Sequence, residues 1–351
     1  MKPGSPLSCT VGTSGASGLR GVFAFSTPDW AIAMGSTLRG MVRMGARRGD
    51  RVVGIGAPGG AHMSKRIYAG FQATRGDAPE LSALTPLPEM VDALNAYRPD
   101  VLVGYCSVGA LLAAEQLAGR LEIAPRAVAF GSEPLTPEMR DRIEAAWGID
   151  PCEYYVSTEQ PVMAMSMPDH PRMLEVMEDL VVLEVVDADD RPVPAGTAGA
   201  KVLVTNLENR ALPLIRYELP DRVTLSPDAN PSGRPYLHLA AIDGRTADTL
   251  TFPGRDGGEV AVLPLRLGAP FAGLPEVRQF QIVHEAGVLE VRVVLDAADT
   301  DVAARVRAAM AQAIADAGAV APEIRVTPVL ELEREPGAAA KLKLIVSRDL
   351  L

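Results

Sequence analysis

Residues 100–147 read DVLVGYCSVGALLAAEQLAGRLEIAPRAVAFGSEPLTPEMRDRIEAAW, and this stretch decides the fold class. Asp100–Gly104 and residues 127–130 are apolar runs of strand length, while residues 107–119 and Pro137–Trp147 are longer and favour helices. Strands that alternate with helices at this spacing are typical of βαβ units with a largely parallel sheet. The stretch therefore predicts an α/β protein.

The same alternation extends towards the N-terminus. Residues 22–26 and 51–55 are predicted strands, and an amphipathic helix is expected from Asp29 to about Arg47. Pro88–Tyr97 also has a helical pattern. Thr136 is the expected N-cap of the helix that follows it.

The pattern changes after about residue 175, where short β-type segments separated by turn residues begin. These segments are residues 181–186, 200–205 and 214–217. Turn residues mark a boundary near 245–250, and the order beyond it is β-β-α-β. Those elements are strands 277–284 and 288–295, a helix over 301–317 and a strand over 324–329. We predict two domains, residues 1–245 and a small α+β domain over residues 246–351.

Composition excludes several classes of protein. The net charge of −10 and the pI near 5.1 argue against a nucleic-acid-binding surface, which needs clustered Lys and Arg. No apolar run is long enough to span a membrane, and Met1–Pro6 lacks the layout of a signal peptide. The three cysteines and four histidines show no metal-ligand spacing, and a reducing, cytoplasmic location is expected.

A Gly/Ser-rich segment, Val11–Gly21, leads into the first predicted strand of the alternating region. Its glycines let backbone N–H groups approach phosphates, and its Thr and Ser hydroxyls add donors. It lacks the Gly-Lys-Ser/Thr ending of a Walker loop and the GxGxxG pattern. By itself such a segment is more often a flexible loop than a phosphate site.

Four further segments carry polar residues suited to chemistry. Tyr154–Glu159 ends a β-type stretch on a carboxylate, a ligand that Mg²⁺ prefers. Pro213–Asp221 ends on an aspartate that can accept both hydroxyls of a ribose. The other two are Ile242–Arg245 at the predicted boundary and Ala339–Lys343 near the C-terminus. Taken singly, each has a structural explanation: a cap, a turn aspartate, a surface arginine or a solvated basic tail.

The order and spacing of these segments resemble the adenylate-forming superfamily, and its phenylacetate–CoA ligase branch in particular. The most specific pieces are Pro213–Tyr217 (Pro-Leu-Ile-Arg-Tyr) and Thr13–Gly18 (Thr-Ser-Gly-Ala-Ser-Gly). Phe130–Leu135 (Phe-Gly-Ser-Glu-Pro-Leu) is similar to that branch's segment beside the nucleotide. The resemblance runs from residue 11 to residue 348. It implies a large N-terminal domain with mixed and parallel sheets flanked by helices, and a small mobile C-terminal lid.

The resemblance also implies site residues. The ATP phosphates would be held by the loop residues Thr13, Ser14, Gly15, Ser17 and Gly18. Other contacts to ATP would come from Ser132, Glu133, Tyr155, Asp221 and Arg245. The catalytic residues would be Thr158, Glu159, which takes Mg²⁺, and Lys341. A lysine on a mobile lid would stabilise the negative charge that grows during transfer and could leave before the second step.

An acyl pocket is expected near the ends of two predicted strands. Its predicted residues are Tyr105, Cys106, Phe130 and Gly131. Cys106 is not expected to be a nucleophile, because none of the scattered histidines is placed as its partner. The Met-rich stretch Met163–Met167 is expected to pack in the core or the cleft.

The sequence departs from the family's pattern in three places. The phosphate loop begins at Val11, so the long segment that precedes it in the family is missing, and we expect the chain to be naturally short, truncated or completed by a partner. The hinge reads Gly244-Arg245-Thr246-Ala247-Asp248 instead of Gly-Arg-x-Asp-Asp. Ala16 and Ala340 stand where a hydroxyl residue and a glycine are common.

We therefore predict an AMP-forming acid–CoA ligase that uses ATP and Mg²⁺ to activate a small aryl or arylacetic acid and then transfers it to CoA. One alternative passes the acyl-adenylate to an amine, a hydroxyl or a carrier protein. The other is a non-catalytic binding protein, which the joint presence of Glu159, Asp221, Arg245 and Lys341 disfavours. A homodimer or a companion chain would cover the large domain.

Overall fold

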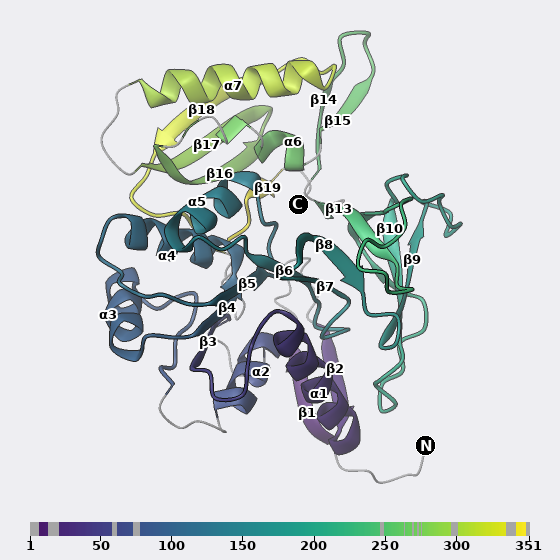
Figure 1. Ribbon diagram of the computed structural model, residues 1–351. Coiled ribbons are helices and arrows are strands. Elements are labelled where there is room, and N and C mark those ends of the chain that lie inside the picture. The colour runs from purple at the N-terminus through teal and green to yellow at the C-terminus, as the bar shows by residue number, and fades with distance from the viewer. Residues whose placement is uncertain are drawn as a thin grey trace.

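A mixed eight-stranded sheet forms the centre of the large N-terminal part of the chain, with strand order β12-β13-β8-β7-β6-β5-β4-β3 (Figure 1). The computed structural model describes residues 7–12, 21–57, 62–72, 78–245, 249–262, 264–268, 270–271, 274, 276–295, 301–334 and 342–348. The four parallel strands are β3 (Val52–Ile55), β4 (Val101–Tyr105), β5 (Ala127–Gly131) and β6 (Cys152–Tyr155). The antiparallel strands are β7 (Ala164–Met167), β8 (His170–Val176), β12 (Asp221–Leu225) and β13 (His238–Arg245).

Helices cover both faces of the parallel strands, because successive side chains of a strand point to opposite faces. Leu102, Val128 and Phe130 face a core shared with three helices. These are α3 (Leu87–Tyr97), α4 (Cys106–Leu117) and α5 (Pro137–Trp147). Val103 and Ala129 face the opposite core, with residues of α1 (Thr27–Arg43) and α2 (Met63–Gln72).

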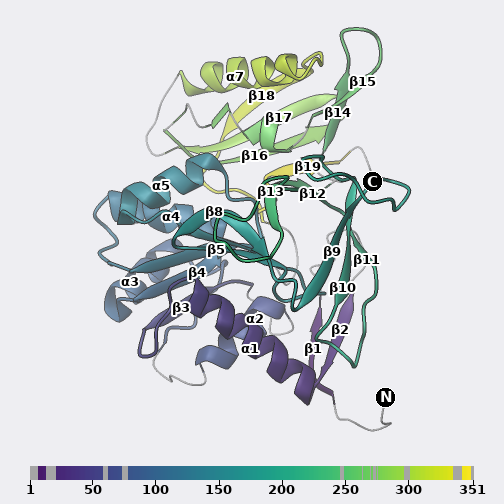
Figure 2. The ribbon, with the colours of Figure 1, turned by 45° about the vertical axis from the view of Figure 1, so that its right-hand side comes forward.

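Two smaller sheets extend the large part. The hairpin of β1 (Leu7–Gly12) and β2 (Val22–Ser26) is antiparallel, and its apolar side packs with α1 and α2. The second sheet has the order β11-β10-β9, from β9 (Val181–Val186), β10 (Lys201–Asn206) and β11 (Tyr217–Leu219). Figure 2 shows it standing beside the hairpin, and Asn209 Nδ2 donates to the Ala24 carbonyl at 3.0 Å to join the two.

The C-terminal part has its own sheet and core. Its strand order is β18-β17-β16-β19, and α7 packs along it (Figure 1). The elements are β14 (Leu250–Pro253), β15 (Glu259–Val262), α6 (Pro264–Gly268), β16 (Val277–Glu285), β17 (Val288–Leu295), α7 (Val302–Asp316), β18 (Glu323–Pro328) and β19 (Ile345–Ser347). Four apolar residues of α7 face this core at helical spacing: Val302, Val306, Met310 and Ile314.

The C-terminal part rests on α4 and α5 of the large part through polar contacts. The Arg142 guanidinium donates to the carbonyls of Val277 at 3.1 Å and Arg278 at 2.7 Å. Arg278 in turn lies 4.0 Å from the Glu115 carboxylate. These contacts are polar, as is common at interfaces between domains.

The structure confirms the α/β class and most predicted elements, with shifts at their ends. Thr136 caps α5, since Met139 N donates to its hydroxyl. The first long helix begins at Thr27, because Ser26 and Asp29 form a capping box. The predicted strand 214–217 is wrong in position: β11 begins at Tyr217, and Leu214 packs in the core beneath the hairpin instead. The domain boundary stays a prediction, since residues 246–248 lie outside the described ranges.

Candidate functional site

The parallel strands end at one edge of the sheet, and predicted site residues follow two of those ends. Ser132 and Glu133 follow β5, and Ser157, Thr158 and Glu159 follow β6 shortly after its end. Ligands of open α/β sheets bind outside the carboxyl ends of the strands. We call this region the carboxyl edge.

The end of β5 is shaped by a close approach between neighbouring strands. A Cβ atom on Gly131 would lie 2.3 Å from the Tyr154 carbonyl oxygen, so only glycine fits between β5 and β6. The next residue, Ser132, has a φ of +63°, a left-handed conformation that is costly for serine. This turn brings Ser132 to the wall of a cavity at the carboxyl edge.

Glu133 joins the large part to the C-terminal part. Its Oε2 accepts from the Ser107 backbone N–H at 2.9 Å, and its Oε1 accepts from the Leu342 backbone N–H at 2.8 Å. Ser107 lies in the first turn of α4, where backbone N–H groups lack partners within the helix and favour a negative charge. The sequence predicted a nucleotide contact for Glu133, whereas the structure shows its carboxylate holding the segment that follows Lys341.

Three predicted ATP-binding residues come together from distant segments. The Tyr155 hydroxyl donates to Asp221 Oδ2 at 2.9 Å. Asp221 begins β12 and pairs in register with Arg245, the last residue of β13. The side chain of Arg245 lies outside the described part of the chain, so the structure places its backbone alone.

The turn that carries Thr158 and Glu159 is held at both ends. Ser157 N donates to the Gln160 carbonyl at 3.0 Å, and Gln160 N donates to the Ser157 hydroxyl at 3.0 Å. The Glu159 carbonyl accepts from Asn206 Nδ2 at 3.2 Å. Among the described residues, none hydrogen-bonds the Glu159 carboxylate. A single available carboxylate fits Mg²⁺, which is commonly held by one or two carboxylates together with water and substrate phosphates.

A cavity of about 90 Å³ opens beside this turn. Its polar lining includes Ser132, Ser157, Thr158, His62, Ser64 and Tyr68. Its apolar lining includes Met41, Met44, Ile67, Val103, Val162 and Met165. The predicted acyl-pocket residues Tyr105, Cys106 and Phe130 are instead packed in the core shared with α3 to α5. The contribution of α1 and α2 was missed, because no sequence pattern says which strand face a helix covers.

Burial keeps two tyrosines and one cysteine of this region neutral. Burial raises the pKa of Tyr68 to about 12, and it raises the pKa of Tyr154 well above its usual value. The Tyr154 hydroxyl donates to the Gly104 carbonyl at 2.6 Å. Burial likewise raises the pKa of the Cys106 thiol, which therefore stays protonated and is a poor nucleophile.

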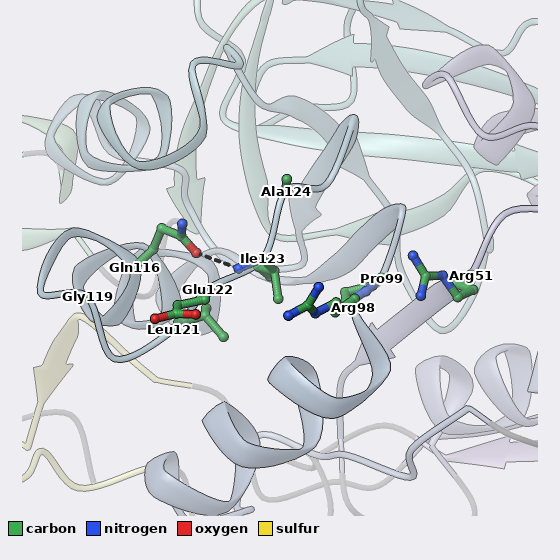
Figure 3. Close-up of a pocket in the computed structure, with 9 residues that line it drawn as sticks. All are labelled: Arg51, Arg98, Pro99, Gln116, Gly119, Leu121, Glu122, Ile123 and Ala124. Carbon is green, nitrogen blue, oxygen red and sulfur yellow. Dashed lines mark hydrogen bonds between the residues drawn. The ribbon is translucent and has the colours of Figure 1, made fainter.

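A larger cavity, of about 480 Å³, lies at the other edge of the same strands. Figure 3 shows Arg51, Arg98 and Pro99 on one side of it and, on the other, residues from the end of α4 and the segment that follows it, from Gln116 to Ala124. These residues precede β3, β4 and β5 in the chain, so the cavity lies at their amino ends. Of the predicted site residues that the structure describes, none lines it.

Two sets of predicted residues fall outside the described ranges. They are the loop residues Thr13, Ser14, Gly15, Ser17 and Gly18, and the lysine Lys341. In the chain, the loop lies between β1 and β2, and the lysine immediately precedes Leu342, which Glu133 holds. Their predicted roles stay predictions. Among the helices of the described residues, none is both long and apolar enough to cross a membrane.

The fold is that of the adenylate-forming CoA ligases. The chain aligns over 99% of its length with 75% of 2-hydroxyisobutyryl-CoA ligase in the postadenylation state, with a TM-score of 0.81 and 23% identity. Against the same ligase in the thioesterification state the TM-score is 0.63. ATP-bound MatB from Rhodopseudomonas palustris gives 0.66, at 20% identity over 97% of this chain and 68% of that chain.

Comparison of sequences finds similarity to the phenylacetate–coenzyme A ligases. The chain is 27% identical to phenylacetate–coenzyme A ligase of Thermus thermophilus over 285 residues, 77% of this chain and 61% of that protein. It is 26% identical to the Pseudomonas putida enzyme of the same name over 291 residues, 79% and 62% of the two chains. No family model matches the chain. The predicted resemblance is confirmed: the chain is similar in sequence to phenylacetate–CoA ligases, and it spans about 61% of the length of the Thermus thermophilus enzyme.

Proposed function

We propose that this chain activates a carboxylic acid with ATP, forming an acyl-adenylate and releasing pyrophosphate. The observation that carries the proposal is the cavity at the carboxyl edge. Thr158 and Ser132, which belong to the two segments that resemble the family's nucleotide site, line the same cavity as the apolar residues of α1, α2 and β7. A carboxylate bound there would have its chain among apolar side chains and its charged end at the nucleotide.

The chemistry proceeds in two steps. A carboxylate oxygen attacks the α-phosphorus of ATP, the bond from this phosphorus to the bridging oxygen breaks, and pyrophosphate leaves with the electron pair. An acceptor then attacks the acyl carbon, loses its proton to solvent, and AMP leaves. We propose CoA as the acceptor, as the names of the relatives suggest; an amine, a hydroxyl or a carrier protein is the alternative.

The residues divide these tasks. Asp221, fixed by the Tyr155 hydroxyl, would accept the ribose hydroxyls, and Arg245 beside it would meet a ribose or phosphate oxygen. Thr158 would donate to the α-phosphate. Glu159 would hold Mg²⁺, whose charge would neutralise phosphate oxygens when bound. The phosphates would lie against the residues Thr13, Ser14, Gly15, Ser17 and Gly18.

Lys341 would supply the cation that stabilises the growing charge on the α-phosphate. The residue that follows it in the chain, Leu342, donates its backbone N–H to Glu133. The polar contact between the two parts could be released and remade, as a lid that moves between the two steps requires.

The test is ATP–pyrophosphate exchange against a panel of acids. We expect acid-dependent exchange, and a loss of at least about 100-fold in Lys341→Ala, because the transition state loses its cation. Lys343→Ala, two residues away, is the matched control and should retain exchange. Exchange by Lys341→Ala at the wild-type rate would refute the role of this lysine, and its absence in the wild type with every acid would refute the proposed function. Adding CoA and measuring thioester separates the two acceptors.

A further inference from the structure

Three methionines line the cavity at the carboxyl edge. Met41 lies in α1, Met44 caps the C-terminal end of that helix, and Met165 lies in β7. All three are buried, with 2% to 7% of their surface exposed. Ser132 and Thr158, which belong to the segments that resemble the family's nucleotide site, line the same cavity, so the chain of an acid bound there would lie against the methionines.

We propose that this cavity selects a short, unbranched or singly branched aliphatic monocarboxylic acid, of about four carbons, and excludes aryl and arylacetic acids. The inference rests on the proposed function, because it assigns the substrate class of that same site.

The first reason for this substrate class is the size of the cavity. A dry apolar cavity that takes benzene has a volume of about 150 Å³. The cavity here measures about 90 Å³ and must also admit the carboxylate end of the acid. The cavity is therefore too small for an aromatic ring together with its carboxylate, whereas a short alkyl chain fits it.

The second reason is the packing behind the cavity walls, which prevents the cavity from widening. A Cβ atom on Gly40 of α1 would lie 2.3 Å from Met165 Cε, so Met165 already presses against the helix backbone. The Tyr68 ring is equally close to β3, since a Cβ on Gly54 would lie 2.5 Å from its Cδ1 atom. Enlarging the cavity on these sides would require backbone movement, which a close-packed interior resists.

The third reason is the charge of the residues that line the cavity. Among the described residues, no carboxylate, lysine or arginine lines the cavity, and the phenols of Tyr68 and Tyr154 stay protonated. The one histidine among these residues, His62, has its Nδ1 3.3 Å from the Ser64 hydroxyl. A second carboxylate on the acid would meet no lysine or arginine among these residues, and leaving it unpaired there is costly. The site therefore favours a monocarboxylic acid with an uncharged chain.

The experiment compares kcat/KM for ATP–pyrophosphate exchange across propionate, butyrate, isobutyrate, succinate, benzoate and phenylacetate. We expect butyrate or isobutyrate to exceed phenylacetate by at least about tenfold, the scale on which apolar pockets discriminate. A value for phenylacetate equal to or above that for butyrate would overturn the inference and leave the proposed function standing.

Two variants test the wall directly. Met165→Ala should raise the ratio of phenylacetate to butyrate activity by at least about tenfold, because it removes a side chain that lines the cavity. Met163→Ala is the matched control: Met163 is fully buried two residues away, in a different core cluster, and its loss should leave the ratio within about twofold of wild type. Met41→Ala, on α1, serves where Met165→Ala does not fold. An unchanged ratio in a folded Met165→Ala or Met41→Ala protein would overturn the inference.

A binding measurement separates this inference from the proposed function. Calorimetric Kd values for non-hydrolysable butyryl- and phenylacetyl-adenylate analogues report the cavity without turnover. Tighter binding of the butyryl analogue, by at least about tenfold, supports the inference. Tighter binding of the phenylacetyl analogue, or no binding of either, overturns it. Analogue binding without any pyrophosphate exchange would instead count against the proposed catalytic activity alone.

Discussion

The two cavities at opposite edges of the same parallel strands differ in size, chemistry and construction. The one at the amino ends of β3 to β5 is larger, about 480 Å³ against about 90 Å³, and is bounded by exposed side chains such as Arg98 and Glu122. The one at the carboxyl edge is lined by buried methionines and by residues from α1, α2, β6 and β7. The comparison teaches that convergence of distant segments, and not volume, identifies the candidate site.

The backbone also differs between the two edges. At the carboxyl edge, Ser132 adopts a positive φ although it is not glycine, and Gly131 fits directly against Tyr154. At the amino edge the positive-φ positions are helix ends, such as Arg98 after α3 and Gly119 after α4. Strained turns inside a sheet persist where packing forces them and are frequent at functional sites, whereas helix-terminal ones are common everywhere.

The largest difference should appear when one carboxylate is removed from each edge. Asp221→Ala should lower pyrophosphate exchange by at least about 100-fold, because the ribose hydroxyls lose their acceptor. Glu122→Ala, at the amino edge, should stay within about twofold of wild type. Steady-state exchange rates with both variants check this, and comparable losses in the two would contradict the assignment of the site to the carboxyl edge.

A second contrast concerns glycines at the two edges. Gly131→Ala should lower the free energy of unfolding by more than about 2 kcal/mol, because its Cβ would collide with the backbone of β6. Gly119→Ala should cost about 1 kcal/mol, since its φ is +72° but nothing lies within 4 Å of the added atom. Urea unfolding of both variants measures the difference. Equal costs would show that strand β6 can shift away.

Removing the Glu133 carboxylate tests the link between the two parts. Glu133→Ala should lower exchange by about tenfold, since the segment carrying Lys341 loses its anchor on the large part. It should also raise the radius of gyration in X-ray scattering, as the C-terminal part moves away. Glu138→Ala, on the neighbouring helix α5, is the control for loss of a carboxylate. A compact, fully active Glu133→Ala protein would exclude this anchoring role.

Glu153 in β6 makes stability depend on pH. Burial raises the pKa of its carboxyl from 4.5 to about 7, although Arg140 opposes the shift. The folded state then holds a proton that the unfolded state has released. The free energy of unfolding should therefore fall as pH rises from about 4.5 to about 7, by on the order of 1 kcal/mol, and level off above that range.

Urea unfolding at several values of pH checks this prediction. Glu153→Gln should remove the dependence between pH 5 and pH 7, whereas Glu144→Gln on the exposed side of α5 should keep it. A stability that rises through this range in the wild type would mean that Arg140 holds the Glu153 carboxyl ionised.

The smallest effect is expected at the amino edge. Arg98→Ala should change exchange by less than about twofold and stability by less than about 0.5 kcal/mol, because its side chain is exposed. Its conformation at the end of α3 is left-handed, so Arg98→Gly should stabilise slightly if it changes anything. A loss of activity in Arg98→Ala would give the larger cavity a function and reverse the comparison.

The fold was largely predictable from local patterns. Leu102 and Val103 lie in a run of strand length, Thr136 is a good N-cap, and α7 has apolar residues at helical spacing. Local sequence patterns did not predict α2 or the antiparallel strands β7 and β8. Whether a short apolar stretch becomes a helix or a strand depends on its neighbours in space.

Motifs in the sequence supplied the candidate site residues, and the structure supplies the arrangement of those that it describes. The motif resemblance pointed to Tyr155 and Asp221, and the structure joins them by a hydrogen bond. It pointed to Glu133 as a nucleotide contact, whereas the carboxylate is engaged by Ser107 and Leu342. The predicted pocket residues Tyr105 and Cys106 are core residues. An apolar run such as β4 does not show whether the residues at its end face a ligand or the core.

The sequence by itself determined the α/β class, the order of the elements and the chemical groups of the proposed site, because periodicity, caps and motifs are local properties. The tertiary structure alone decided that methionines of α1 and β7 line the cavity, that Glu133 reaches across to Leu342, and that Asp221 meets Tyr155. Each of these contacts joins residues far apart in the chain, and long-range packing and strand pairing bring them together only after the whole sheet has formed.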